Sequence, residues 1–329
     1  MQYSGLHITA LGAGGRLPLV VEPSSRGVQL AAVASEVTAL VGAELERAGG
    51  LLFRGFDVQG VAEFQRFAAS FGHALLGYDF GSTPRSKVSA GVYSSTEYPA
   101  HQSIPLHNEQ SYATSWPLKI WFYCPQPAPS GGETPIADSR LVYSRIPARI
   151  RERWASRGLR YVRNYGAGLD LPWPKVFNTS DRGEVEAYCR AHEIAWEWKD
   201  DGELRTSQLC QAVARHPRTG EDVWFNQAHL FHVSALEEEV REVLLDAVSE
   251  QDLPRNVYYG DGGPLEPELL DEIRAVLEAS QVVFPWQKDD ILMLDNMLAA
   301  HARNPFSGPR KVVVAMAEPY SVGGVNAPA

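Results

Sequence analysis

The chain has 329 residues, of which 44% are hydrophobic and 21% charged, and its formal net charge is −10. This composition is typical of a soluble globular protein with a sizeable core. The negative charge argues against a nucleic-acid-binding protein, which needs a basic surface to displace counterions from phosphates, and against binding to an anionic membrane surface.

The cysteines and the N-terminal residues bear on the cellular compartment. Cys124, Cys189 and Cys210 are odd in number and far apart, which argues against a disulfide framework or a cysteine-based zinc site. No basic segment followed by an apolar one opens the sequence, and no run of about 18 apolar residues occurs. We therefore expect a cytoplasmic protein without a membrane span.

Helices and a short strand are predicted at the start of the chain. Apolar residues at helical spacing predict a helix over 28–48, which the Gly49-Gly50 pair ends. A short buried strand is predicted at 51–53. A second helix is predicted over 64–71 and ends at Gly72.

Strands and loops are predicted from 75 to 137. The aromatic residues of 119–124 favour a strand, and the Pro- and Gly-rich residues 127–132 favour a turn. A further short strand is predicted at 134–137.

Helical patterns return after this segment. Asp138 or Ser139 is positioned to cap a helix that reaches about Arg157. The capping box Ser234-x-x-Glu237 predicts a helix through about Val248. The remaining predicted elements are a helix at 266–279 and strands at 282–284, 291–294 and 312–316.

The order of these elements predicts the fold class. Strands lie near both ends of the chain with helices between them, and no regular βαβ alternation is present. This favours a mostly β, α+β protein with an antiparallel sheet core and helices outside. No linker rich in Pro, Gly or Ser divides the sequence, so we expect one elaborated domain over 1–329, with a flexible tail at 321–329.

A candidate metal motif lies at residues 105–112, which read PLHNEQSY. In a strand, His107 and Glu109 would point to the same side and could bind one ion through an imidazole nitrogen and a carboxylate oxygen. With 9 histidines and 40 acidic residues in the chain, about one such triplet is expected by chance. A third ligand is therefore needed to support the site.

His301 has the most suggestive setting of the other histidines. It follows the predicted strand 291–294, and Arg310 lies nine positions later on the returning strand. Two histidines and one carboxylate leave three positions open on an octahedral ion, which is the facial triad of non-haem Fe(II) oxygenases. On spacing alone, a satisfied loop histidine at 107 and a turn histidine at 301 remain the alternative.

Several segments, in this order and spacing, resemble the taurine dioxygenase (TauD/TfdA-like) superfamily of Fe(II)/2-oxoglutarate-dependent oxygenases. The chain is most similar to hydroxylases of peptide-antibiotic pathways, such as the syringomycin aspartyl hydroxylase group, and more distantly to clavaminate synthase. The segments are 93–99 (YSSTEYP), 106–112 (LHNEQSY), 131–138 (GGETPIAD), 226–229 (NQAH) and 301–310 (HARNPFSGPR).

The resemblance implies a distorted double-stranded β-helix (jelly roll) and assigns roles to five residues. His107, Glu109 and His301 would bind Fe(II). Thr134 and Arg310 would hold the distal carboxylate of 2-oxoglutarate, since a guanidinium binds a carboxylate in a bidentate fork and a hydroxyl adds one donor.

Two positions depart from the family pattern. Glu109 stands where Asp is commoner, as in the clavaminate synthase branch, and Ala302 stands where Gly is expected. Related halogenases lack the carboxylate ligand, so its presence favours oxygenation.

The reaction implied by the resemblance is hydroxylation of a C–H bond of an amino acid, free or tethered to a carrier protein, in secondary-metabolite biosynthesis. O2 and 2-oxoglutarate are consumed, and succinate and CO2 are released. Desaturation, epoxidation or ring formation by the same site is one alternative. A non-catalytic binding protein on an oxygenase scaffold is the other, and the complete set of five residues argues against it.

Polar residues close to the quoted segments are candidates for substrate contacts, although each could be structural instead. They are Ser94, Thr96, Asn108, Asn164, His229 and Arg303.

An arginine cluster is independent of the resemblance. Eight arginines lie in the 24 residues Arg140–Arg163 of this acidic protein. A solvated helix face is the simplest interpretation. The alternative is a docking surface for an acidic partner, such as a peptidyl carrier domain, because complementary charge speeds encounter and selects partners.

Overall fold

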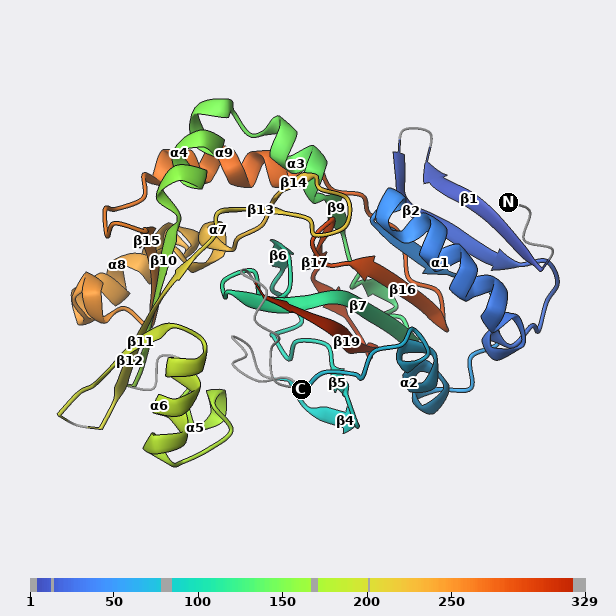
Figure 1. Cartoon of the computed structure of the whole chain (residues 1–329), viewed down its shortest axis with the longest axis horizontal. Coiled ribbons are helices and arrows are strands. Elements are labelled where there is room, and N and C mark those ends of the chain that lie inside the picture. The colour runs from blue at the N-terminus through green and yellow to red at the C-terminus, as the bar shows by residue number, and fades with distance from the viewer. Residues whose placement is uncertain (1–4, 13–14, 78–84, 167–170, 201, 322–329) are drawn as a thin grey trace.

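The computed structural model describes residues 5–12, 15–77, 85–166, 171–200 and 202–321. Of the predicted flexible tail, only Ser321 lies within the described residues. Figure 1 shows one group of strands flanked by α1 and α2 and a second group flanked by α3, α4 and α9, with β6 and β17 between them. No helix among the described residues is long and apolar enough to cross a membrane.

The larger sheet has eight strands and joins both ends of the chain. Its order is β1-β2-β3-β16-β7-β19-β5-β4, and every neighbouring pair except the parallel β2–β3 is antiparallel. The strands are β1 (Leu6–Gly12), β2 (Gly15–Pro23), β3 (Gly50–Phe53), β4 (Lys87–Ser89), β5 (Val92–Ser94), β7 (Ser115–Gln126), β16 (Asp290–Asp295) and β19 (Lys311–Ser321).

The central strands of this sheet are buried on both faces, so their side chains alternate between two cores. Met293 of β16 faces a core that helices α1 (Ala34–Ala48) and α2 (Val61–Ala69) cover. Leu292 faces the other core, which lies toward a smaller sheet. The predicted helix end is confirmed, because Gly49 follows α1 in a left-handed conformation with φ of 80°.

The smaller sheet has the order β6-β17-β9 and is antiparallel. Its strands are β6 (Ile104–His107), β9 (Ile136–Asp138) and β17 (Ala299–Arg303). Ile136 and Ala299 contribute to the core that it shares with the larger sheet. Two of the predicted metal ligands therefore belong to this sheet, His107 at the end of β6 and His301 within β17.

A separate four-stranded sheet has the order β11-β12-β10-β15. Helices α3, α4, α6 and α9 pack with it around one large apolar cluster. The elements are α3 (Ser139–Arg145), α4 (Ala148–Arg157), β10 (Leu159–Tyr165), α6 (Arg182–Ala191), β11 (Ile194–Trp198), β12 (Leu204–Cys210), β15 (Arg255–Tyr259) and α9 (Pro267–Glu278).

Short elements complete the described structure. They are η1 (Leu30–Val33), β8 (Ser130–Gly131), α5 (Trp173–Val176), β13 (Val213–Arg215), β14 (Asp222–Trp224), α7 (Ala228–Phe231), η2 (Val233–Ala235), α8 (Glu238–Ala247), η3 (Glu250–Asp252) and β18 (Phe306–Ser307).

The mostly-sheet α+β class is as predicted, but the helix expected from Asp138 to Arg157 is two helices. Asp138 does cap the first, accepting hydrogen bonds from the N–H groups of Arg140 and Leu141. The chain then becomes extended at Ile146, because the ring of Pro147 disfavours helical backbone in the residue before it.

Two further predictions are wrong. Residues 282–284 form no strand, and only Val282 makes an isolated bridge with Ile136. The Ser234 hydroxyl does not cap α8, because it bonds to His232 and Arg274 instead.

Candidate active site

The two histidines of the predicted site face each other across neighbouring strands. In the register of β17 and β6, His301 lies directly opposite His107. Their ring centroids are 4.4 Å apart, as expected for opposed side chains on one face of an antiparallel pair. Strand pairing therefore brings together two donors that are far apart in the sequence.

Glu109 reaches the same point from a turn. The expectation that His107 and Glu109 share one strand face is wrong, because β6 ends at His107 and Glu109 lies in the turn that follows. The Oε2 atom of Glu109 nevertheless lies 3.8 Å from Nε2 of His301. One donor atom from each of the three residues lies within 4.8 Å of the other two, and no other such group occurs among the described residues.

The chemistry of these donors fits a divalent iron ion. The 3.8 Å separation suits two atoms that each bind one ion at about 2.0–2.2 Å, the range known for zinc. Burial lowers the pKa of His107 and holds the pKa of His301 well below its usual value, so both rings are neutral and can donate a lone pair. Nδ1 of His107 donates to the carbonyl of Pro105 at 2.9 Å, which leaves Nε2 for the metal.

A partly buried cation, Arg310, lines the cavity beside these candidate ligands. Burial lowers the pKa of Arg310 to about 10, so the guanidinium stays charged at neutral pH. Its Nε donates to the carbonyl of Gly132 at 2.9 Å, and Nη1 lies 3.4 Å from the hydroxyl of Ser95. The indole N–H of Trp286 donates to the Thr134 hydroxyl at 3.1 Å, so this hydroxyl is free to direct its own proton to a ligand.

The Gly131-Gly132 turn makes room for this arginine. Gly132 has φ of 75°, and a Cβ placed there would lie 2.9 Å from both Cδ and Nε of Arg310. A Cβ on Gly131 would lie 2.2 Å from the carbonyl oxygen of Pro305. Only glycine allows both the backbone conformation and the close approach.

One cavity connects the two histidines with Thr134 and Arg310. His107, His301, Thr134 and Arg310 all line it, and apolar side chains such as Phe122 complete its wall. The ring of Phe122 packs against His301 with centroids 4.9 Å apart. This arrangement puts nitrogen donors that can bind a metal and a guanidinium that can bind a carboxylate side by side in one cavity.

Sequence reasoning missed one of the three arginines that line this cavity, Arg85. The Arg85 side chain is 3% exposed, and its Nη2 donates to Oε2 of Glu109 at 2.7 Å. No motif links the two residues, which are 24 positions apart. Arg85 thus pairs its positive charge with the candidate ligand Glu109.

Two of the six candidate substrate residues line the cavity, Thr96 and Arg303. The Nη1 and Nη2 atoms of Arg303 donate to four backbone carbonyls of residues 96–102, so this cation holds that loop in place. The hydroxyl of Ser94 bonds to Glu97 and to the backbone N–H of Ser86.

The other three candidates are engaged elsewhere. Asn108 donates to Ser139 and to the carbonyl of Asn296. Asn164 of β10 donates to the carbonyls of Gln251 and Leu253 in another part of the molecule. The Nε2 of His229 donates to the carbonyl of Leu106 in β6, and the His229 side chain lines a neighbouring cavity. The structure does not bring these three side chains to the cavity that His107 and His301 line.

Two buried histidines make the stability of the fold depend on pH. Burial lowers the pKa of both His229 and His232 to about 4. An unfolded histidine binds a proton near pH 6.5, so between about pH 6.5 and 4 the unfolded state takes up protons that the native state does not. We expect the free energy of unfolding to fall by about 2 kcal/mol per histidine from pH 8 to pH 5, measured by urea denaturation. His232→Gln should lose about 2 kcal/mol of the wild-type change, and an unchanged pH slope in this variant would contradict the assignment.

The arginine cluster is largely paired within the chain. Arg149 binds Glu272 at 2.5 Å, Arg153 binds Glu266 at 2.5 Å and Arg157 binds Asp261 at 2.7 Å. Arg163 is only 3% exposed. Much of the expected positive surface is therefore compensated by acidic residues of the same chain.

A family model and two proteins of known name are similar to this chain in sequence. The model of the family described as "Taurine catabolism dioxygenase TauD, TfdA family" matches residues 14–316. Dapdiamide synthesis protein DdaC of Enterobacter agglomerans is 44% identical over 275 residues, which cover 84% of each chain. A clavaminate synthase-like protein of Arabidopsis thaliana is 31% identical over 282 residues, which cover 83% of this chain and 82% of that protein.

Solved structures agree in fold. PvcB from Pseudomonas aeruginosa matches with a TM-score of 0.56 at 17% identity, over 96% of this chain and 92% of that chain. A second structure of PvcB, described as an Fe, alpha-ketoglutarate dependent oxygenase from an isonitrile synthetic pathway, matches with a TM-score of 0.56 at 18% identity, over 96% and 93%.

Proposed function

The chain belongs to the TauD, TfdA family of 2-oxoglutarate-dependent dioxygenases, and on this premise we propose that it hydroxylates an unactivated C–H bond of an amino acid. The observation that carries the proposal is the single cavity in which the two histidines meet Thr134 and Arg310. The reaction would convert the substrate, 2-oxoglutarate and O2 into the hydroxylated product, succinate and CO2.

His107, Glu109 and His301 would hold Fe(II) and leave three positions open for 2-oxoglutarate and O2. Bound Fe(II) would supply the electrons for activating O2. Arg310 and the Thr134 hydroxyl would bind the distal carboxylate of 2-oxoglutarate and orient its other end toward the metal ligands. Ile104, Phe122 and Val312 would keep water away from the reacting groups.

Arg85 supports a substrate that carries a carboxylate. Of the arginines that line the cavity, Arg310 is assigned to 2-oxoglutarate, and Arg303 holds the loop 96–102. Arg85 lies next to the metal ligand Glu109, where a substrate must come to react. A guanidinium at this place can bind the carboxylate of an amino acid and fix the position of its side chain.

Replacing Arg85 with glutamine tests this role. A charge-assisted hydrogen bond contributes about 1.5–3 kcal/mol, so KM for an amino-acid substrate should rise about 10- to 100-fold. KM for the primary amide of the same amino acid should change little. Because Arg85 also contacts Glu109, Fe(II) affinity is measured in parallel. Equal effects on acid and amide would rule out the carboxylate contact.

The proposed activity is tested by a substrate screen. Purified protein with Fe(II), 2-oxoglutarate and O2 is offered free amino acids and carrier-tethered ones, and succinate and product mass are measured. Gain of one oxygen atom with an intact hydrogen count indicates hydroxylation of a saturated substrate. Loss of two hydrogens indicates desaturation or ring formation, and oxygen gain on an alkene indicates epoxidation. Absence of succinate with every substrate would favour the non-catalytic binding protein.

The biological setting is proposed by analogy. The relative DdaC is named for dapdiamide synthesis, and we propose that this chain also acts in secondary-metabolite biosynthesis. Docking of an acidic carrier domain on Arg140–Arg163 stays a prediction, and the internal ion pairs of that cluster weaken it. Three free cysteines in the described structure are compatible with the proposed cytoplasmic setting.

We also infer that the larger and the smaller sheets are the two walls of a distorted double-stranded β-helix (jelly roll). The apolar core between them and the position of both histidines on the smaller wall support this architecture. On the same basis, we propose that residues 1–329 act as one domain.

A further inference from the structure

The Asn296 side chain holds the backbone of the proposed ligand Glu109 on both sides. Asn296 follows β16 and is completely buried. Its Oδ1 accepts a hydrogen bond from the N–H of Glu109 at 2.7 Å, and its Nδ2 donates to the carbonyl of Glu109 at 3.0 Å. Nδ2 also donates to the carbonyl of Pro117 at 2.9 Å. The carboxamide thus makes the two hydrogen bonds with the Glu109 backbone that a neighbouring strand would otherwise make.

Glu109 needs such support because it lies outside the strand ladders. The strand β6 ends at His107, and Gln110 has a positive φ of 56°. A turn of this kind does not fix the direction of the Glu109 side chain through sheet hydrogen bonds. The two bonds from Asn296 do so, and a third contact joins Asn108 Nδ2 to the Asn296 carbonyl at 2.6 Å.

The turn that carries Asn296 is itself fixed by its neighbour Asp295. Oδ1 of Asp295 accepts from the N–H groups of Met297 and Leu298 at 3.0 and 3.1 Å. The backbone N–H of Asn296 donates to the carbonyl of Leu118 at 2.8 Å. Asp295 is completely buried, so its charge must be compensated inside the protein.

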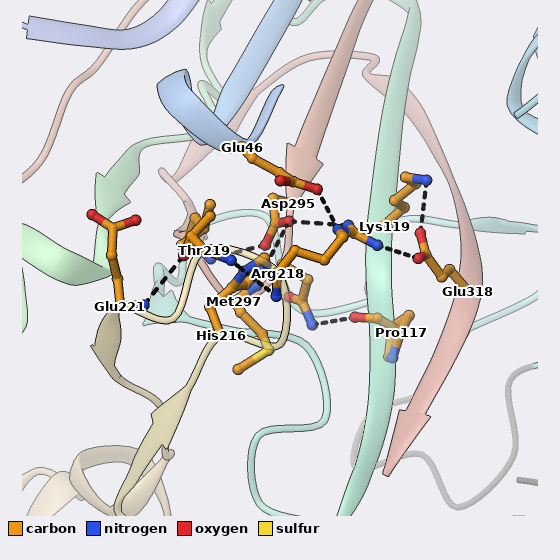
Figure 2. A network of polar contacts seen from close by, with 12 residues as sticks. Glu46, Pro117, Lys119, His216, Arg218, Thr219, Glu221, Asp295, Met297 and Glu318 are labelled. Atoms are coloured by element: carbon orange, nitrogen blue, oxygen red, sulfur yellow. Dashed lines mark hydrogen bonds and ion pairs between the residues drawn. The ribbon is translucent and has the colours of Figure 1, made fainter. Parts of the chain in front are cut away.

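A polar cluster of Asp295, His216 and Arg218 supplies this compensation (Figure 2). Nδ1 of His216 accepts from the N–H groups of Arg218 and Thr219, so its Nε2 carries the proton and donates to Oδ2 of Asp295 at 3.1 Å. Nη2 of Arg218 lies 3.8 Å from the same Oδ2. In the described structure the cluster extends through Arg218 to Glu46 of α1 and to Glu318 of β19.

The cluster therefore connects the turn at 295–298 with α1, β7, β19 and the β13–β14 connection. Glu318 also binds Lys119 of β7 at 2.7 Å, and His216 and Arg218 come from the β13–β14 connection. Buried ion pairs are rarely more stabilising than apolar side chains of the same volume. The effect of this arrangement is instead to hold the turn at 295–298 in one position.

We propose that Asn296 is a positioning residue that directs Glu109 at the metal, and that the cluster of Asp295, His216 and Arg218 holds Asn296 in place. Asn296 does not touch the substrate or the reacting atoms in this scheme. The inference concerns metal binding and does not depend on which substrate is hydroxylated.

The test compares Asn296→Ala with a matched control, Asn256→Ala. Asn256 of β15 is 2% exposed, and its Oδ1 accepts from the N–H groups of Val257 and Val233. Its Nδ2 bonds to Tyr258 and Glu250, and within the described residues its side-chain hydrogen bonds do not involve a proposed ligand. Both variants therefore lose a buried carboxamide with several hydrogen bonds, and only one of them contacts Glu109.

The readout is the Kd of Fe(II), from anaerobic titration in the presence of 2-oxoglutarate, together with thermal stability. Loss of a group that orients a ligand typically weakens metal binding about 10- to 100-fold, and we expect this for Asn296→Ala. Asn256→Ala should lose stability and keep the wild-type Kd. A wild-type Kd in Asn296→Ala, or an equal weakening in Asn256→Ala, would overturn the proposal.

Two further variants test the proposal if Asn296→Ala does not fold. Asn296→Asp keeps the shape but loses the Nδ2 donor to the Glu109 carbonyl, and Asp295→Asn removes the charge that binds His216. Both should raise the Kd of Fe(II), and wild-type affinity in both would overturn the proposal. If wild-type protein itself binds no Fe(II), the proposed function fails, which is a different outcome from a wild-type Kd in the variants.

Discussion

Replacing His301 with alanine is expected to abolish succinate formation and to leave the purified protein with little bound iron. The variant loses one of three donors that lie within 4.8 Å of one another. Its ring cannot be replaced by solvent in the same geometry, because it is buried between Phe122 and the facing His107. Two remaining donors bind iron far more weakly than three.

A matched variant separates this effect from a general loss of structure. His232 is also buried, but it lies outside the cavity that His301 lines. His232→Ala should lower thermal stability and keep iron binding and turnover. Wild-type iron content in His301→Ala, with turnover retained, would exclude His301 as a ligand.

Replacing Arg310 with glutamine should raise KM for 2-oxoglutarate about 100-fold. The guanidinium lines the cavity together with Thr134, and a charge-assisted pair with a carboxylate contributes about 1.5–3 kcal/mol. At saturating 2-oxoglutarate, kcat should fall much less than kcat/KM, because the contact lies at the end of the co-substrate that does not react.

A second co-substrate makes this prediction specific. In 2-oxovalerate a methyl group replaces the distal carboxylate of 2-oxoglutarate. Wild-type protein should strongly prefer 2-oxoglutarate, and Arg310→Gln should lose most of this preference. A variant that keeps the wild-type preference would show that another group binds the distal carboxylate.

The three candidate metal ligands could be named from the sequence, but their geometry could not. His107 and Glu109 stand in a recognisable triplet, and His301 opens a segment that resembles the same family. The direct opposition of His107 and His301 depends on the register of β6 against β17, which is a long-range property. The turn at Glu109 also broke the two-residue periodicity on which the strand prediction rested.

The supporting residues could not be found in this way. Arg85 contacts Glu109 across 24 positions, and Asn296 contacts it across 187. Neither distance corresponds to a helical or strand period, so no local pattern marks these contacts. For the arginine cluster, the sequence led to an overestimate of the exposed positive charge. Its acidic partners, such as Glu266 and Glu272, lie more than 100 positions away in the sequence.

Local sequence signals were sufficient to predict features that depend only on residues close in the sequence. The helix end at Gly49 and the cap at Asp138 follow from the conformational freedom of glycine and from a carboxylate that accepts backbone N–H groups. Pro147 carried an equally local signal for a helix break, which the prediction of a single helix to Arg157 did not take into account.

Anaerobic addition of Fe(II) and then 2-oxoglutarate to metal-free protein tests the central claim most directly, with wild type and His107→Ala compared. We expect a visible charge-transfer band in wild type only when both are present, and no band in His107→Ala. This result would establish the metal and the co-substrate in one site together with the role of His107. Absence of the band in wild type would contradict the site described here.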